Sequence, residues 1–424
     1  MNRKLSLIVL VISLLVAAFV VAGATLNGGR RGQDDPSTVP YRQMDVYQEV
    51  LEHINNDYVT TPDLNTVTDG ALHGLLESLD PDSSYLDPAE YKAYEAEQRT
   101  PERGHVGLVV TKRFGYAAIV DVTPGSPAAR AGLGRGDFLE AIGDKSTRDL
   151  SLQAIRALLG GAPGSTVEVS AVLLHRVQPE KITLTRAELP SAPPTTQLYD
   201  GQIGAIKVPD LKAGRARQIA AAIRELTSRG AKKFVLDLRD CGQGEYGEAE
   251  AVANLFIKQG TITYLQGQEY PRQVVTAGPG KAITDAPLAV LTNVGTYGPA
   301  EIIAAAVLGD HRGDVVGDRT YGEGSLQKLL PLEGGGAVLL SVARYYAPNG
   351  GAIQGQGVKP NVPQVRYAGA PPQDDMPLEG VPPSSQDLQL QKALEVLRGK
   401  SAAAIAPPAA AVKPARAQAA GAAA

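Results

Sequence analysis

Apolar residues recur at helical spacing soon after residue 40, and two such runs follow each other. The first run predicts one amphipathic helix and consists of Tyr47, Val50, Leu51, Ile54 and Tyr58. The second predicts another helix and consists of Ala71, Leu72, Leu75, Leu76 and Leu79. Asp80-Pro81 and Asp87-Pro88 then interrupt the pattern. We therefore expect an N-terminal helical unit over residues 41–100.

Residues 101–187 have a different pattern, with short runs rich in β-branched residues. Val106–Thr111, Tyr116–Val122 and Val167–Val172 predict strands, and Leu150–Leu159 predicts a helix among them. A small, mostly β domain is therefore expected here.

Predicted strands and helices alternate over residues 195–366. The strands are expected at Ile203–Val208, Phe234–Leu238, Thr261–Tyr264 and Leu288–Asn293. The helices are expected at Ala213–Ser228, Glu248–Gln259 and Ala300–Leu308. This order predicts an open α/β sheet with flanking helices, whose functional sites lie at the carboxyl ends of the strands. Leu189–Leu198 holds three prolines and predicts a linker in front of this sheet.

The N-terminus has the pattern of an export segment. Asn2, Arg3 and Lys4 precede the uncharged run Leu5–Gly29, which is long enough to cross a bilayer as a helix. Ala22-Gly23-Ala24 fits a signal-peptidase site, whereas the length of the run favours an uncleaved anchor. We expect residues 1–30 to be a signal peptide or membrane anchor. The expected location is the cell envelope, periplasmic or otherwise extracytoplasmic, with inner-membrane anchoring if the segment stays uncleaved.

The C-terminal part of the chain, residues 367–424, is rich in proline and alanine. Only Asp387–Leu397 has helical periodicity there, so we expect this tail to be mostly disordered.

Composition narrows the functional classes. The 424 residues include 20% charged residues and carry a net charge of −4, without the basic patch of a nucleic-acid-binding protein. Cys241 is the only cysteine, so no disulfide forms within the chain. No His, Asp or Glu pair has metal-ligand spacing, and we expect neither a metal nor another cofactor.

Several motifs occur in order along the chain and together point to one family. They are Leu79-Asp80-Pro81, Ser83–Pro88, Gly125–Leu133 followed by Gly136-Asp137, Asn293–Glu301, Tyr321–Gln327, Ser341–Gly350 and Ile353–Val358. Over about Tyr41–Arg366 the chain resembles the C-terminal processing peptidases (tail-specific proteases), which are PDZ-containing Ser/Lys serine peptidases. The resemblance implies an α/β peptidase core of the ClpP/crotonase-like type over residues 195–366. It also implies an inserted PDZ domain over residues 101–187, after the N-terminal helical unit.

The resemblance also implies where the catalytic residues should lie, and this chain departs from the family there. One family pattern is N-x-G-S-A-S-A-S-E, with its middle serine as nucleophile. Another is F-G-K-G-x-x-Q, with its lysine as general base and its glutamine assisting. Aligned without gaps, the nucleophile position is Gly298, the base position is Glu323 and the glutamine is Gln327.

A Ser/Lys site needs a hydroxyl within hydrogen-bond reach of an amine whose pKa is lowered by burial. Gly298 has no hydroxyl, and Glu323 reverses the charge of the base. A carboxylate is also a much weaker base than a neutral amine. We therefore expect no acyl-enzyme by the family route.

The oxyanion loop departs from the family pattern as well. That pattern, D-L-R-N-N-P-G-G, falls on Asp237–Gly244. Here Gly242 replaces the proline and Gln243 replaces the first glycine, so the amides of Gln243 and Gly244 are not expected to be presented as in an active enzyme.

Four other residues are candidates to replace the missing groups. Thr296 lies two positions before Gly298 but should point elsewhere, and Cys241 has no histidine that the sequence pairs with it. His105 belongs to the PDZ segment, and His311 is expected at the surface.

Peptide binding by the PDZ domain depends mainly on backbone groups, which survive substitution. A peptide would add as a strand, with its C-terminal carboxylate held by loop amides. The expected peptide-binding residues are Gly104, His105, Val106, Gly107, Leu108, Val109 and Val110. The alternative is a PDZ domain that only supports the core.

The hypothesis that these observations favour is an exported, catalytically inactive PDZ protein with the processing-peptidase fold, which binds extended peptides or protein C-termini. The alternative is an active serine-type endopeptidase with relocated catalytic groups. The sequence identifies no oligomeric state.

Overall fold

The computed structural model describes residues 39–99, 104–174, 176, 178–189, 191–366 and 387–399. The expected export segment and most of the expected C-terminal tail lie outside these residues. Among the described helices, none is both long enough and apolar enough to cross a membrane.

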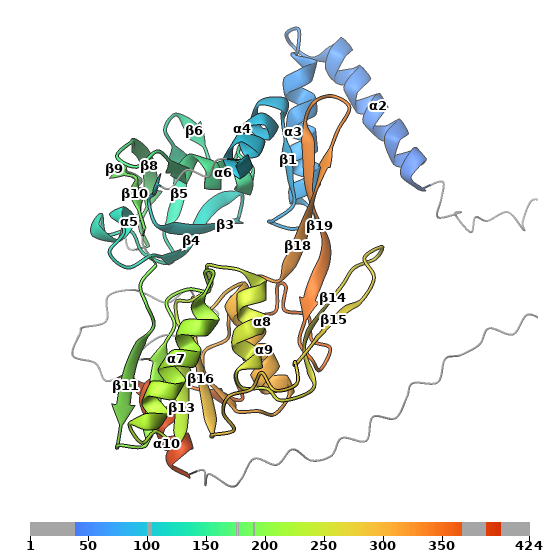
Figure 1. Ribbon diagram of the computed structural model, residues 1–424. Helices are drawn as coiled ribbons and strands as arrows, with labels where there is room; N and C mark the ends of the chain where they lie inside the picture. Colours follow the sequence, from blue (N-terminus) through green and yellow to red (C-terminus); the bar gives the residue numbers. More distant parts are fainter. Residues whose placement is uncertain are drawn as a thin grey trace, which may run out of the picture. The chain divides into compact units, whose positions relative to one another are not determined.

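The chain divides into two compact units, residues 1–69 and residues 70–424. The first unit contains helix α2 (Val39–Asp57) and the beginning of α3 (Leu64–Glu77), as the helical spacing predicted (Figure 1). Helix α3 ends two residues before Leu79, which was expected to belong to it. Strand β1 (Ser84–Leu86) and helix α4 (Pro88–Arg99) follow in the second unit.

The segment expected to form a PDZ domain folds as a sheet with two helices, α5 (Pro127–Arg130) and α6 (Leu152–Leu159). Its main sheet has the order β3-β4-β5-β8-β9, with β6 beside β5. The strands are β3 (Leu108–Arg113), β4 (Tyr116–Val122), β5 (Phe138–Ile142), β6 (Lys145–Ser146), β8 (Thr166–Val172) and β9 (Glu180–Thr185). A smaller sheet joins β2 (Gly104–His105) to β7 (Gly160–Gly161) and β10 (Ala187–Glu188). Of the run Val106–Thr111, expected as one strand, only Leu108–Thr111 belongs to β3, because Val106 and Gly107 (φ 88°) lie in the turn between β2 and β3.

The core contains a six-stranded sheet of order β11-β12-β13-β16-β17-β20. Its strands are β11 (Thr195–Tyr199), β12 (Ile203–Lys207), β13 (Lys233–Asp237), β16 (Leu288–Thr292), β17 (Asp314–Gly317) and β20 (Val362–Pro363). All neighbours are parallel except β11 and β12. Because β11 begins at Thr195, the linker is shorter than the Leu189–Leu198 predicted.

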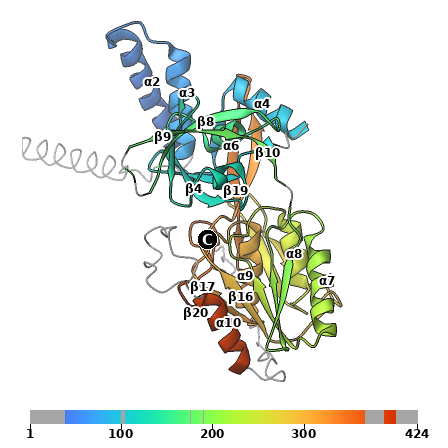
Figure 2. The same ribbon diagram turned by 90° about the vertical axis from the view of Figure 1, so that its left-hand side faces the viewer.

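Alternate residues of these strands pack against opposite layers of helices. Phe234, Leu236 and Val290 lie in one cluster with α7 (Arg215–Ser228), α8 (Tyr246–Asn254) and α9 (Pro299–Gly309). Val235 and Leu291 pack instead against α10 (Leu388–Gly399). Figure 2 shows α10 on one side of the sheet and α7 and α8 on the other. Two-sided burial explains why these strands appear as continuous apolar runs.

Helix α8 is shorter than the predicted Glu248–Gln259. The side-chain amide of Asn254 donates to the Glu250 carbonyl at 2.8 Å, and its oxygen accepts from the Gly278 N–H at 2.7 Å. This residue ends the helix, although Phe256 and Ile257 continue the apolar pattern and are buried.

A second core sheet has the order β1-β19-β14-β15, with β18 paired to the other edge of β19. Its remaining strands are β14 (Thr261–Gln266), β15 (Gln273–Thr276), β18 (Ser325–Pro331) and β19 (Ala337–Tyr346). Sequence periodicity did not identify β15, β18 or β19.

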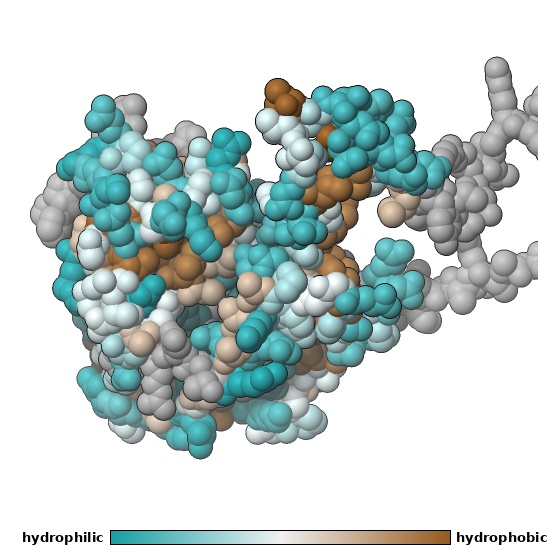
Figure 3. All heavy atoms as spheres, turned by 90° about the horizontal axis from the view of Figure 1, so that it is seen from above, coloured by the Kyte–Doolittle hydropathy of each residue, from teal (hydrophilic) through white to brown (hydrophobic). Residues whose placement is uncertain are grey.

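On the face seen in Figure 3, hydrophilic residues cover much of the surface and hydrophobic patches lie between them.

Candidate active site

Gly298 lies at a sharp turn between the buried strand β16 and the buried helix α9. Its backbone angles are φ 54° and ψ −125°, which side-chain-bearing residues rarely adopt. A strained strand–turn–helix of this kind is the geometry that exposes the nucleophile in α/β-hydrolases. The Gly298 turn (residues 293–298) thus has the backbone of a nucleophile site with no side chain at its apex.

The space at the apex is open to a small side chain. A Cβ placed on Gly298 would have two neighbours within 4 Å beyond the adjacent residues, the Gly242 carbonyl at 3.6 Å and Glu323 Oε2 at 3.9 Å. The structure therefore brings Glu323 to the position expected for the general base.

Glu323 is a partly exposed carboxylate with a distant cation. Its side chain is 29% exposed, and Oε1 lies 3.9 Å from a guanidinium nitrogen of Arg156 on α6. Burial raises the pKa of Glu323, Arg156 opposes the rise and Asp82 adds to it. The group offers a carboxylate where the family chemistry requires a neutral amine.

Glu301 fixes the Gly298 turn against the segment that carries Glu323. Its fully buried carboxylate accepts hydrogen bonds from the backbone N–H groups of Gly298 at 3.0 Å, Gly322 at 2.8 Å and Glu323 at 2.7 Å. It also accepts from the hydroxyl of Thr320. Burial raises the pKa of Glu301 to about 8, and these hydrogen bonds oppose the rise. Sequence reasoning placed Glu301 in a motif but gave it no role.

Gln327 does not contact Glu323. Its amide donates to Ser325 Oγ at 2.6 Å, and Ser325 in turn donates to Asp82 at 3.2 Å. Asp82 lies 3.8 Å from Arg156, which also faces Glu323. The retained glutamine is therefore linked to the base position only through intervening polar groups.

The expected oxyanion loop is tied to a neighbouring segment. The Gln243 carbonyl accepts from the Leu211 N–H at 2.6 Å, and the Glu245 N–H donates to the Leu211 carbonyl at 3.0 Å. Gly244 has φ 138°, and a Cβ there would lie 2.2 Å from the Leu211 backbone, so only glycine fits.

Tyr297 is a residue that sequence reasoning missed. It replaces an alanine of the family pattern, and its side chain is almost fully buried. A Cβ on Gly242 would lie 2.4 Å from the Tyr297 ring, so the ring occupies space that a proline at position 242 would need. An aromatic residue within an otherwise small-residue motif was the available signal.

Thr296 and Cys241 do not replace the nucleophile. Thr296 is fully buried, and its hydroxyl donates to the Leu238 carbonyl at 2.7 Å and accepts from the Asn293 N–H at 3.1 Å. Cys241 is also fully buried, and burial strongly raises the pKa of its thiol. Neither group has the exposure or activation of a nucleophile. His311 is exposed after α9.

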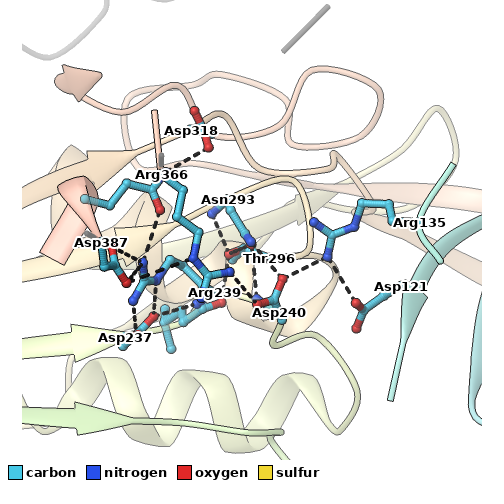
Figure 4. A network of polar contacts seen from close by, with 12 residues as sticks. Asp121, Arg135, Asp237, Arg239, Asp240, Asn293, Thr296, Asp318, Arg366 and Asp387 are labelled. Atoms are coloured by element: carbon cyan, nitrogen blue, oxygen red, sulfur yellow. Dashed lines mark hydrogen bonds and ion pairs between the residues drawn. The ribbon is translucent and has the colours of Figure 1, made fainter. Parts of the chain in front are cut away.

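An ion network surrounds the oxyanion loop (Figure 4). Asp240 accepts from Asn293 at 2.7 Å and from Arg135 of the PDZ domain at 2.8 Å. Although burial opposes it, Arg135 lowers the pKa of Asp240 to about 2. Arg239, the residue before Asp240, pairs with Asp237 and with Asp387, which lies just before α10. The described residues include no group of three or more His, Cys, Asp or Glu arranged to hold a metal.

The expected peptide-binding strand lies at an edge of the PDZ sheet. Among the strands that the structure describes, β3, which includes Val109 and Val110, pairs only with β4. One end of this region adjoins the base position, since Val109–Arg113 and Tyr321–Glu323 line the same pocket of about 260 Å³. The structure therefore brings the candidate peptide strand and Glu323 together.

In the expected carboxylate-binding loop, one backbone N–H already has a hydrogen-bond acceptor within the loop. The Gly107 N–H donates to His105 Nδ1 at 2.9 Å. Burial and the nearby Arg186 lower the pKa of His105, which favours the neutral ring that can accept this bond. Gly107 has φ 88°, and a Cβ there would lie 2.1 Å from Ser126 Cβ. Gly107 is thus required by the fold of the loop itself.

Comparisons with known proteins agree with this architecture. The model of peptidase family S41 matches residues 202–364, and a PDZ domain model matches residues 119–171. The carboxy-terminal processing protease CtpA of Bacillus subtilis is 30% identical over 367 residues, covering 85% of this chain and 78% of that protein. The carboxyl-terminal-processing protease of Synechocystis sp. is 30% identical over 340 residues, covering 78% of this chain and 76% of that protein.

Among solved structures, the photosystem II D1 C-terminal processing protease is similar with a TM-score of 0.63 and 26% identity. The match covers 75% of this chain and 86% of that one. The similarity therefore includes the α/β core and the PDZ domain together.

Proposed function

Because the chain belongs to the C-terminal processing peptidases of peptidase family S41, we propose that it is a catalytically inactive member that binds peptide or protein C-termini. The observation that carries the proposal is the geometry at Gly298. The apex has no hydroxyl, and the side chain nearest to it from elsewhere in the described chain is the carboxylate of Glu323. Without nucleophile and amine base, no acyl-enzyme forms by the family route.

The burial of Thr296 and Cys241 argues against an active enzyme with relocated groups. The packing of the Tyr297 ring beside Gly242 also argues against an active enzyme, since the ring occupies the space that the proline of the family pattern would need. Both observations support a site that forms no acyl-enzyme.

Absence of turnover is tested by incubating the purified protein with an unfolded protein and, separately, with a serine-reactive probe. We expect neither cleavage nor labelling, while an active serine peptidase in parallel gives both. Cleavage that disappears in Thr296→Ala or Cys241→Ala would contradict the proposal and identify the relocated nucleophile.

Binding of C-termini rests on the open edge of β3 and on the backbone amides of the loop before it. The carboxylate of a bound peptide would replace His105 Nδ1 as the acceptor of the Gly107 N–H. Because a charged carboxylate is the stronger acceptor, peptides with a free C-terminus should bind better than amidated ones. A contact of this size should have a Kd on the order of micromolar, about −8 kcal/mol. Calorimetric titration with free-acid and C-terminally amidated forms of one peptide library tests this. Equal binding of the two forms, or no binding of either, would indicate that the PDZ domain only supports the core.

The export proposal rests on the apolar run near the N-terminus, Leu5–Gly29. Fractionation of cells with and without this segment is the test. We expect the full chain in the envelope fraction and the truncated chain in the cytoplasm.

A further inference from the structure

Three side chains of the loops that surround Gly298 reach the PDZ domain. Asp240 contacts Arg135, Glu323 faces Arg156, and the Gln243 amide lies 3.5 Å from the hydroxyl of Thr123. We propose that these loops form a docking surface that holds the PDZ domain in one orientation on the core. This inference concerns the domain interface and stands independently of peptide binding.

Arg135 makes the strongest of these contacts. Its Nε donates to the Val120 carbonyl at 2.7 Å, and one Nη donates to Asp121 at 3.0 Å and to Asp240 at 2.8 Å. The Arg135 side chain is 13% exposed and that of Asp240 is 25% exposed, so salt screens the pair little. Removing one partner from such a pair is costly, because the other charge is left buried.

Asp240 is itself held rigidly in the core. Its backbone N–H donates to Asn293 Oδ1 at 3.1 Å, and its carboxylate accepts from Asn293 Nδ2 at 2.7 Å. The carboxylate also lies 3.5 Å from Arg366. A fixed acceptor gives the Arg135 contact a defined direction as well as an energy.

The second and third contacts are longer than the contact between Arg135 and Asp240. The 3.9 Å pair of Glu323 and Arg156 is long and partly exposed, so it contributes little energy by itself. Its sign still matters, since a lysine at position 323 would place a cation beside Arg156. Thr123, the partner of Gln243, donates its N–H to the Gly107 carbonyl and so joins this contact to the carboxylate-binding loop.

Packing closes the interface between these polar contacts. Val294 and Tyr321 of the core face Thr111, Ala118 and Val120 of the PDZ sheet across a cavity of only about 20 Å³. Each polar contact comes from a position where this chain departs from the family pattern, Asp240, Gln243 and Glu323. Positions 243 and 323 serve catalysis in that pattern, whereas here their side chains contact the PDZ domain.

Distance measurements between spin labels test the proposal in the whole protein. Phe114 of the PDZ domain and Arg224 of α7 are exposed and would be replaced by cysteine, whereas Cys241 is fully buried and should stay unlabelled. We expect one narrow distance distribution in the parent protein. Asp240→Asn and Arg135→Gln should each broaden it, and combining them should add little, because both remove the same contact.

Glu323→Lys serves as a second variant, because a partly exposed side chain can be changed without unfolding the core. It should broaden the distribution less than Asp240→Asn. Lys181→Gln removes an ion pair with Glu168 inside the PDZ sheet and is the matched control, with no expected change. A broad distribution in the parent protein, or an unchanged narrow one in all folded variants, would overturn the proposal.

Discussion

At the residue scale, the alignment of two short motifs predicted that Gly298 and Glu323 would lie close together. Gly298 and Glu323 occupy neighbouring positions in space, as the alignment implied. The contacts that remodel the site could not be predicted, because they join distant segments. Tyr297 fills the space beside Gly242, and Arg135 reaches Asp240 across 105 residues. No local pattern reports such pairs.

The packing of Tyr297 beside Gly242 predicts that peptidase activity cannot be restored by replacing only the nucleophile and the base. Gly298→Ser with Glu323→Lys supplies both groups, but the loop still carries Gln243 and is packed against Tyr297. We expect the pair to cleave an unfolded protein very slowly. Adding Gln243→Gly should help, and adding Tyr297→Ala with Gly242→Pro should help further. A misplaced oxyanion donor costs about 100-fold or more in rate, so the pair should lie at least that far below the five-substitution variant.

Cleavage rates of the series at equal concentration provide the measurement, with circular dichroism to confirm that each variant folds. Gly298→Ser alone is the control and should be inactive. If the pair is as fast as the five-substitution variant, the oxyanion loop is intact and our interpretation of Tyr297 is wrong.

At the element scale, prediction succeeded where one face of an element is strongly apolar or both faces are buried. Strands β12, β13 and β16 and helices α7, α9 and α10 were found within two residues of their ends. Strands β18 and β19 were missed because their side chains are mostly half-buried and their stability comes from pairing with each other and with β1. The end of α8 depends on Asn254 hydrogen bonds that periodicity does not report.

Helix α10 should contribute strongly to stability although it lies in a Pro/Ala-rich region. Its Leu397 is fully buried against the sheet, and the Leu397 carbonyl accepts from Lys233 Nζ at 2.6 Å. Leu397→Ala should lower the free energy of unfolding by about 2–5 kcal/mol through lost burial and a cavity. Urea unfolding measures this. Leu332→Ala, at a 40% exposed position, is the control and should cost under about 1 kcal/mol. Equal effects of the two substitutions would mean that α10 is not packed as described.

At the scale of the whole molecule, Arg135 pairs with Asp121 of the PDZ domain and with Asp240 of the core, and the pKa values of these two carboxyl groups shift in opposite directions. Burial raises the pKa of Asp121 to about 6, with Arg135 opposing the rise and Asp240 adding to it. Asp240 is shifted the other way, to about 2. Asp240 therefore stays ionised to low pH beside Arg135, whereas Asp121 keeps its proton to a higher pH. This asymmetry gives stability a pH dependence that can be assigned to Asp121.

The folded state binds the Asp121 proton more tightly than the unfolded chain, whose aspartates titrate near pH 4. The Asp121 contribution to the free energy of unfolding should therefore fall as the pH rises from about 4 to about 6, by up to about 3 kcal/mol, and stay constant above. Asp318, whose pKa burial also raises to about 6, contributes a slope of the same sign, so the difference between variants is the informative quantity. Urea unfolding across this range should give a flatter curve for Asp121→Asn than for the parent protein. Asp200→Asn, at an exposed surface pair with Arg398, should leave the parent slope unchanged. Identical slopes in the parent and in Asp121→Asn would mean that Asp121 is ionised throughout and that Arg135 compensates both carboxylates equally.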